Sequence, residues 1–483
     1  MSALGDLASF PTETLLQIFE YLDGRDLVRC QRVCKALRHH IDQCSATQYV
    51  IRLAMCGYTD GTQSQGGGFS LIGARLNALE EHINRWKYLN WEEQRIEIPT
   101  RIPDCEVLVG GIYVLISQTI ITCVQLPSKI RHIPLRAWSF ENDFTVTALA
   151  MDPSQDLLVL LEIRQESEVS YLHFRTLSDN TRHPRVFATI PSGRYVRSHD
   201  IMIVGDTIAF HQYPSTFTWN WCTGTLLSEE FLDTHLGGIR WIGPKKLLGC
   251  RWGEGPSGAL VVFGLDQDGN RREIVALDLP VRPSSAPRSF SCFLGQLAVP
   301  HPSGVLPFDS SSVYIIHLSG VDFRMPQDFD LVIPVSTIER YASDRYDGPF
   351  SVPWDVWASE NTRVVPHSRC RQHRIFRNRT VRVEAGAQSR IKVLDFTPNL
   401  SVWPDSSHHR PSDARGVCYT KFVGRSESAI DVYPETFART NLPYHESHRI
   451  LETPLREPRS VQVDDENIVI ADVSFPSWRG GRF

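Results

Sequence analysis

Near the start of the chain, apolar residues recur at helical spacing. Four of them occupy positions i, i+3, i+4 and i+7, which lie on one face of an α-helix: Leu15, Ile18, Phe19 and Leu22. Asp23-Gly24 then predicts a turn, and two further short helical patterns run through residues 26–44. About 35 residues bury too little surface to be stable alone. This three-helix module, which we place at residues 5–45, therefore needs the rest of the chain or another protein to cover its apolar side chains.

Residues 46–98 continue the helical pattern as a connector. Helical spacing runs to residue 58, a polar glycine-rich segment at 59–68 predicts a loop, and a second helix follows with Leu76, Leu79, Ile83 and Trp86 on one face. We expect the aromatic end of this helix to pack against the domain that follows.

After about residue 100 the helical period gives way to short apolar runs separated by Gly, Asp, Pro and Asn, which is typical of β-strands. Five segments have the pattern of a hairpin, an apolar strand, a short turn and a second apolar strand: 107–116, 148–161, 201–210, 239–250 and 460–471. Where they are clear, such units recur about every 40 to 55 residues, the spacing of propeller blades. The chain is thus predicted to be an α+β multidomain protein in which residues 99–483 form an all-β domain, a β-propeller of six to eight blades. The alternative is two packed β-domains, and the hairpin at 460–471 is expected to pair with the first blade and close the ring.

Composition and charge limit the cellular compartment and the classes of partner that we expect. The chain has 483 residues, a net charge of -5 and 42% hydrophobic residues, without an apolar run long enough to span a membrane. Its beginning lacks the basic and apolar stretches of a signal peptide, and its 11 cysteines are scattered without framework spacing. We expect a cytoplasmic and/or nuclear protein without a membrane partner, and no nucleic-acid partner because the net charge is negative.

The amino-terminal module resembles the F-box family, whose pattern runs Leu-Pro-x-Glu, Ile-Phe-x-x-Leu, Asp-Leu and Val-Cys-Lys. Eleven positions carry the resemblance: Phe10, Pro11, Glu13, Ile18, Phe19, Leu22, Asp26, Leu27, Val33, Cys34 and Lys35. Phe10 and Leu37 depart from the family's usual leucine and aromatic residue, but both remain apolar. Farther along, Trp219 to Gly224 (WNWCTG) resembles the Trp-Asp-x-x-Thr-Gly signature of WD-repeat proteins, with Asn220 in place of aspartate. The combination is similar to fungal F-box proteins.

The resemblance implies a function in ubiquitin ligation. It implies that the chain is the substrate-recognition subunit of an SCF-type (Skp-cullin-F-box) ligase, that its partners are a Skp-type adaptor and through it a cullin, and that the β-domain binds an unknown substrate protein. By this resemblance the adaptor-binding residues are Phe10, Pro11, Leu15, Ile18, Phe19, Leu22, Leu27, Val33, Cys34 and Leu37. No catalytic residue, metal or cofactor is expected. The alternatives are a propeller-fold enzyme, which would gather carboxylates of raised pKa in a central pocket, and a non-degradative F-box scaffold.

Two segments of the chain, one basic and one acidic, are candidates for binding sites. Residues 363–392 hold nine cations against a single acid, and a phosphate-bearing or other partner could bind Arg369, Arg371, Arg374, Arg377 and Arg379. The favoured interpretation is a solvated basic insertion between blades. Asp464-Asp465-Glu466 lies in the predicted turn of the 460–471 hairpin, where solvated acids are usual.

Overall fold

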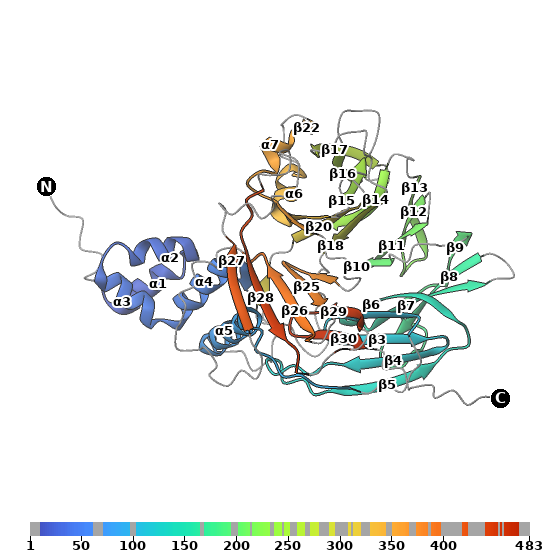
Figure 1. The fold of residues 1–483 in the computed structure, drawn as a ribbon, viewed down its shortest axis with the longest axis horizontal. Helices are drawn as coiled ribbons and strands as arrows, with labels where there is room; N and C mark the ends of the chain where they lie inside the picture. The colour runs from blue at the N-terminus through green and yellow to red at the C-terminus, as the bar shows by residue number, and fades with distance from the viewer. Residues whose placement is uncertain are drawn as a thin grey trace.

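The computed structural model has an amino-terminal group of helices beside a large ring of β-sheets (Figure 1). It describes residues 10–60, 71–96, 103–164, 169–194, 201–212, 215–231, 236–243, 246–251, 258–265, 271–279, 289–294, 308–310, 313–319, 329–343, 350–366, 373–384, 388–397, 418–423, 440–452, 455 and 458–472.

Five helices precede the sheets: α1 (Thr12–Phe19), α2 (Gly24–Gln31), α3 (Lys35–Gln43), α4 (Ser45–Cys56) and α5 (Ile72–Tyr88). The Asp23 side chain caps α2 by accepting a 2.8 Å hydrogen bond from the Asp26 amide. Leu79, Ile83 and Trp86 of α5 are buried on one face, as the helical spacing predicts. A short strand that the pattern did not predict, β1 (Tyr58–Asp60), follows α4 and pairs with β19 (Phe308–Ser310).

Five sheets have the strand order of propeller blades, because their first four strands are antiparallel and follow one another in the chain. The first three blades are β2 (Cys105–Val109), β3 (Ile112–Ser117), β4 (Ile120–Gln125) and β5 (Arg136–Glu141); β6 (Val146–Asp152), β7 (Leu157–Arg164), β8 (Val169–Thr176) and β9 (Ile190–Arg194); and β10 (Ile201–Val204), β11 (Thr207–Gln212), β12 (Ser215–Asn220) and β13 (Thr225–Phe231).

The fourth and fifth blades carry additions. The fourth contains β14 (Leu236–Gly243), β15 (Lys246–Arg251), β16 (Ala259–Leu265) and β17 (Arg271–Asp278), with β22 (Ser351–Val352) added in parallel to β17. The fifth contains β18 (Ser289–Leu294), β20 (Val313–Ser319), β21 (Phe329–Pro334) and β23 (Arg363–Pro366), with α6 (Val335–Tyr341) and α7 (Trp354–Trp357) inserted before β23. These insertions lengthen the blade, so dividing the chain length by a standard blade overestimates the number of regular blades.

A sixth sheet and a hairpin complete the ring without having blade order. The sixth sheet begins with β24 (His373–Phe376), β25 (Arg379–Glu384) and β26 (Arg390–Asp395). Next to β26 comes β28 (Tyr444–Ile450), and β27 (Cys418–Val423), which precedes β28 in the chain, forms the edge of the sheet. The hairpin contains β29 (Pro458–Val463) and β30 (Ile468–Asp472). The predicted propeller is therefore confirmed with five regular blades rather than six to eight.

Apolar clusters join each unit of the ring to the next. The first strands of successive units lie side by side at several junctions, including β2 with β6, β14 with β18, and β24 with β29. Each of seven clusters contains buried or partly buried residues of two neighbouring units. One residue from each of the two units, taken cluster by cluster around the ring, gives these pairs: Val114 and Leu160, Leu172 and Phe210, Ala209 and Val261, Leu260 and Leu331, Val332 and Leu394, Val381 and Val461, and Val469 and Leu108. The hairpin at 460–471 thus closes the ring, but in the described residues it does so by side-chain packing and not by the strand pairing that we predicted.

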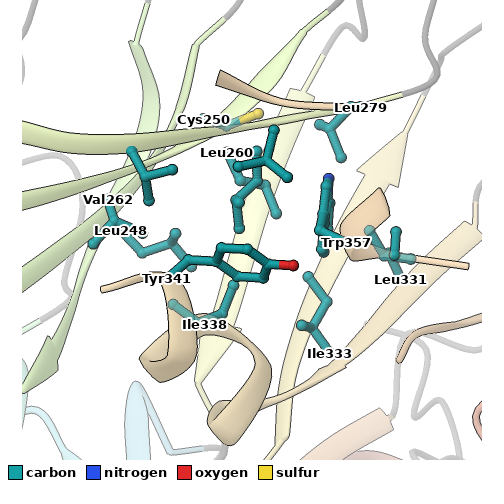
Figure 2. Close-up of a cluster of buried hydrophobic side chains, with 14 of the residues drawn as sticks. Leu248, Cys250, Leu260, Val262, Leu279, Leu331, Ile333, Ile338, Tyr341 and Trp357 are labelled. Carbon is teal, nitrogen blue, oxygen red and sulfur yellow. The ribbon is translucent and has the colours of Figure 1, made fainter. Parts of the chain in front are cut away.

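The junction of the fourth and fifth blades is the largest of these clusters (Figure 2). Ile338 and Tyr341 of α6 and Trp357 of α7 enter it from the inserted segment, and the Trp357 indole donates a 2.9 Å hydrogen bond to the Asp278 carbonyl. These three side chains of the insertion are therefore part of the core.

The WNWCTG segment forms the turn between β12 and β13. The Asn220 side chain accepts hydrogen bonds of 3.0 Å from the amides of Cys222 and Thr223, and Gly224 has a φ of 70°, a left-handed conformation that favours glycine. Asn220 thus makes the turn contacts that an aspartate oxygen could also make. Trp221 is fully buried between the second and third blades.

Candidate functional site

The three amino-terminal helices are held by one small apolar core. It contains six buried residues: Leu15, Phe19, Leu27, Leu37, Ile41 and Ile51. Ile51 belongs to α4, so the module uses the connector to complete its core. Gly24 allows a close approach of α2 and α4, because a Cβ atom at this position would lie 2.4 Å from the Ala54 Cβ and 2.8 Å from the Val50 carbonyl oxygen.

The predicted adaptor-binding residues divide into two groups. The structure buries four of them in that core: Leu15, Phe19, Leu27 and Leu37. Leu22 and Cys34 are half-buried, and the exposed ones are Phe10 (46%), Pro11, Ile18 (38%) and Val33 (72%). Tyr21, which our sequence analysis did not select, is 90% exposed. Phe10, Ile18, Tyr21 and Val33 are thus the large apolar side chains that the described part of this module leaves exposed.

A buried arginine joins the connector to the propeller. Arg379, in β25, donates from Nε to Asp395 Oδ2 at 2.7 Å and from Nη2 to the Tyr58 hydroxyl at 3.0 Å, and its guanidinium lies 4.5 Å from the centre of the Trp86 ring. Burial would lower the pKa of Arg379, but Asp395 and Tyr58 raise it above its usual value, so the group stays charged. The joint therefore contains a compensated ion pair, a cation-π contact and a buried phenol.

His82 and Tyr58 extend this contact into the helices. His82 Nε2 lies 3.1 Å from the Tyr58 hydroxyl. Burial and the nearby arginines, Arg379 first among them, hold the pKa of His82 well below its usual value. His82 is thus neutral at physiological pH and is a structural partner of Tyr58.

The end of α5 is also tied to β28. The Arg449 Nη1 donates to the carbonyls of Leu89 (2.6 Å) and Trp91 (3.0 Å), and the Ser447 hydroxyl donates to the Lys87 carbonyl at 2.9 Å. Leu89 is fully buried and has a φ of 47°, so the chain turns sharply where α5 ends. These bonds fix the direction in which the helices leave the ring.

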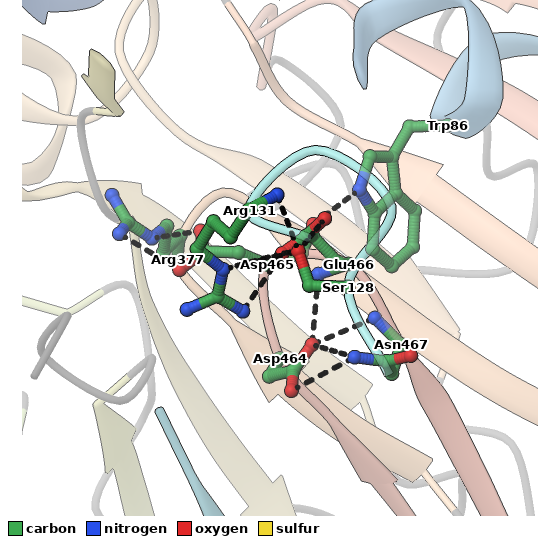
Figure 3. A network of polar contacts seen from close by, with 8 residues as sticks. All are labelled: Trp86, Ser128, Arg131, Arg377, Asp464, Asp465, Glu466 and Asn467. Carbon is green, nitrogen blue, oxygen red and sulfur yellow. Dashed lines mark hydrogen bonds and ion pairs between the residues drawn. The ribbon is translucent and has the colours of Figure 1, made fainter. Parts of the chain in front are cut away.

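The turn of the β29–β30 hairpin is a second joint, which we call the closing turn (residues 464–467; Figure 3). Asp465 forms an ion pair with Arg377, whose Nε lies 2.8 Å from Oδ1 and whose Nη2 donates to Oδ2 at 3.1 Å. The Asp465 carbonyl accepts from the Trp86 indole at 2.8 Å. Glu466 pairs with Arg131 at 2.7 Å and accepts from the Ser128 hydroxyl at 2.6 Å. The closing turn therefore joins α5, the first blade and the sixth sheet at one place.

Asp464 is buried inside the closing turn. One of its oxygens accepts from the amides of Glu466 (2.8 Å) and Asn467 (2.7 Å), and burial is the main cause that raises its pKa to about 6. The expectation of solvated acids is wrong for Asp464, Glu466 and, in part, Asp465, because they satisfy buried arginines and backbone amides.

Four of the six cations whose side chains the structure describes in the basic segment at 363–392 are interior. Arg363, Arg377, Arg379 and Arg382 are buried, and Arg382 pairs with Asp330 at 3.2 Å. A solvated insertion is therefore the wrong description of these four. Arg377 and Arg379, which we had considered for a phosphate-bearing partner, contact Asp465 and Asp395. Arg369 and Arg371 lie outside the described residues, as does the side chain of Arg374.

The enzyme alternative predicts carboxylates of raised pKa in a pocket. Asp464 is a carboxylate whose pKa is raised, and it serves the closing turn. A hollow of about 400 Å³ beside β8 is lined by His173, Phe174, Arg175, Arg182, Val186, Phe187, Ala188 and Thr189, without a carboxylate. Within the same described ranges no group of three metal-ligating side chains occurs, and no helix is long and apolar enough to cross a membrane.

Comparison with known proteins supports the assignment of the helices. Residues 7–46 match the family model "F-box-like", so the chain carries an F-box-like domain beside its propeller. No curated protein matches the chain. Solved structures with some similarity include the WD40 domain of SCAP from fission yeast (9% identity, 77% of this chain and 80% of that chain, TM-score 0.35) and Kluyveromyces lactis Hsv2p (10%, 60% and 92%, TM-score 0.31). The N-terminal domain of Nup159 is similar at 10% identity over 61% of this chain and 71% of that chain, with a TM-score of 0.30. Likenesses this weak add nothing to the fold described above.

Proposed function

We propose that this protein is the substrate receptor of an SCF-type ubiquitin ligase, with the F-box-like domain bound to a Skp-type adaptor and the propeller bound to the substrate protein. The observation that carries the proposal is the F-box-like match at residues 7–46 on helices whose exposed apolar residues include Phe10, Ile18 and Val33. F-box and propeller modules typically bind proteins and are not catalytic, so the receptor itself is proposed to carry no catalytic residue.

The polar contacts of Arg379 and Arg449 and those of the closing turn favour a receptor of fixed geometry, and not a pair of loosely linked modules. A receptor must hold its substrate at a set place relative to the ligase, and Arg379, Arg449 and the closing turn fix α5 on the ring. Loops on one face of a propeller provide a broad and rigid surface for a protein partner. The proposed partners are thus the adaptor, through it a cullin, and a protein substrate.

The test is affinity purification with a recombinant Skp-type adaptor. Ile18→Asp with Val33→Asp should abolish adaptor binding while the melting curve stays unchanged, because both side chains are exposed. Phe187→Asp with Val356→Asp is the matched control, since these residues are 74% and 62% exposed on the propeller. Leu15 is unsuitable as a target, because a charge in the module core would unfold it.

The outcomes separate the alternatives. Adaptor binding that survives Ile18→Asp with Val33→Asp contradicts the proposed surface, and failure of the wild type to bind any Skp-type adaptor contradicts the function. Proteins that co-purify with both the wild type and the Ile18→Asp, Val33→Asp variant are substrate candidates. If the adaptor complex does not recruit the cullin, the protein is a non-degradative scaffold and not a ligase receptor.

A further inference from the structure

A stripe of cations runs along the exposed face of α2. Arg25, Arg29 and Arg32 stand at i, i+4 and i+7, so they project from one side of the helix, opposite the buried Gly24 and Leu27. Lys35 and Arg38 continue the basic character into α3, and all five cations are exposed. Residues 24–38 contain one acid, Asp26, whereas the whole chain has a net charge of -5.

Most of the stripe has no counter-charge within the described part of the molecule. Arg29 pairs with Asp26 at 2.6 Å, and Arg38 lies 3.6 Å from Asp42. The side chains of Arg25, Arg32 and Lys35 form no hydrogen bond or ion pair with a described residue. Two of these cations, Arg32 and Lys35, thus stand on either side of the turn between α2 and α3, and Arg25 stands at the start of α2.

Val33 lies between Arg32 and Lys35, in the turn between α2 and α3. It follows Arg32, precedes Lys35 by two residues and is 72% exposed. A partner that covers Val33 must come close to both cations and remove part of their water. Removing water from unpaired charges is costly unless opposite charges replace it.

We infer that the basic stripe of α2 and Lys35 is an electrostatic docking surface for an acidic patch on the adaptor, with Val33 as the apolar contact between Arg32 and Lys35. This inference rests on the proposed function, because it states the charge of the adaptor surface that the F-box-like domain meets. Complementary charge at the edge of an interface speeds association and sets orientation more than it lowers the dissociation rate.

The experiment measures the association rate of the full chain with a recombinant Skp-type adaptor between 50 and 500 mM NaCl. Over this range the Debye length falls from roughly 14 Å, where screening is weak, to roughly 4 Å, where screening is strong. The test variant is Arg25→Glu, Arg32→Glu and Lys35→Glu. Its matched control is Arg272→Glu, Arg390→Glu and Arg459→Glu, which makes the same charge change at exposed propeller positions. The neutral set Arg25→Gln, Arg32→Gln and Lys35→Gln replaces the test variant if the glutamates disturb folding.

We expect the test variant to associate about tenfold or more slowly than the control at low salt, and the difference to shrink as salt rises. The neutral set should lie between the two. If test variant and control associate equally fast with an adaptor that binds the wild type, the electrostatic surface is overturned while the proposed function stands. If the wild type does not bind the adaptor at all, the proposed function itself has failed.

Discussion

The helical module and the propeller achieve burial in different ways. Seven apolar junctions repeat around the ring, and each neighbour covers the next. The helical module has one core of six buried residues and leaves Tyr21 and Val33 almost uncovered. The ring is thus a self-supporting structure, whereas the module is a small projecting arm.

The contact between these regions differs from both. It combines an apolar part, in which Trp86 and Leu89 pack against the sixth sheet and the last hairpin, with directional polar bonds of Arg379, Arg449 and the closing turn, and these bonds set the angle of the arm. Apolar contacts are non-directional, while hydrogen bonds to charged groups constrain geometry. The difference suggests that stability resides in the ring and orientation in the polar joint.

Breaking the joint should have the largest effect. Arg379→Met leaves Asp395 buried without its cation, which should lower the free energy of unfolding by about 3–5 kcal/mol. Arg382→Met is the matched control, because Arg382 also pairs with a buried aspartate but does so within the propeller. Hydrogen exchange should show faster opening of α5 for Arg379→Met than for Arg382→Met. Equal exchange of α5 in the two variants would show that Arg379 does not hold the arm.

A smaller effect is expected from Asp464 and depends on pH. Its folded pKa of about 6 lies above the ordinary 3.8, so the folded state binds the proton more tightly and the charged form is disfavoured. This group therefore lowers stability as pH rises from about 4 to 6, by up to about 3 kcal/mol from a shift of roughly two pKa units. Asp464→Asn keeps an oxygen for the two amides but does not ionise.

Denaturant unfolding of wild type and Asp464→Asn between pH 4 and 7 measures this contribution. The variant should gain stability relative to the wild type as pH rises, with the gain complete above pH 6. A constant difference across this range would contradict the assigned titration of Asp464.

The smallest change in stability is expected from a substitution within the helical module. Gly24→Ala adds a methyl group where the Ala54 Cβ would be 2.4 Å away, so α2 and α4 must separate. Overpacking of this kind costs about 1–3 kcal/mol. Gly73→Ala is the control, since no atom lies within 4 Å of a Cβ there. Hydrogen exchange in α2 should rise for Gly24→Ala while the blades stay protected, and loss of protection in the blades would show that arm and ring unfold together.

Local patterns predicted the hairpins well. The alternation of apolar runs and turns at 107–116 and 148–161 depends on neighbouring residues, and β2–β3 and β6–β7 form there. The helical spacing of Leu79, Ile83 and Trp86 likewise predicted the buried face of α5. In each case the signal and the structure lie within the same few residues.

The polar joint could not be predicted in this way, because its partners are far apart in the chain. Arg377 meets Asp465 after 88 residues, and Arg379 meets Tyr58 across 321. A cluster of arginines therefore looks like a basic surface until its carboxylates are located. A usable signal was that Arg382 stands between Val381 and Val383, an alternation that is typical of a strand and not of a solvated insertion.

The bond from Trp86 to Asp465 also has a consequence for how the protein is made. It spans 379 residues, and at about 5–20 residues per second a ribosome needs on the order of 20–80 seconds to add them. During that interval the F-box-like helices have emerged, but the turn that fixes their direction has not been synthesised. If an adaptor binds these helices as we propose, it would meet them before the ring closes, and the growing propeller would complete its last junction beside helices that are already occupied.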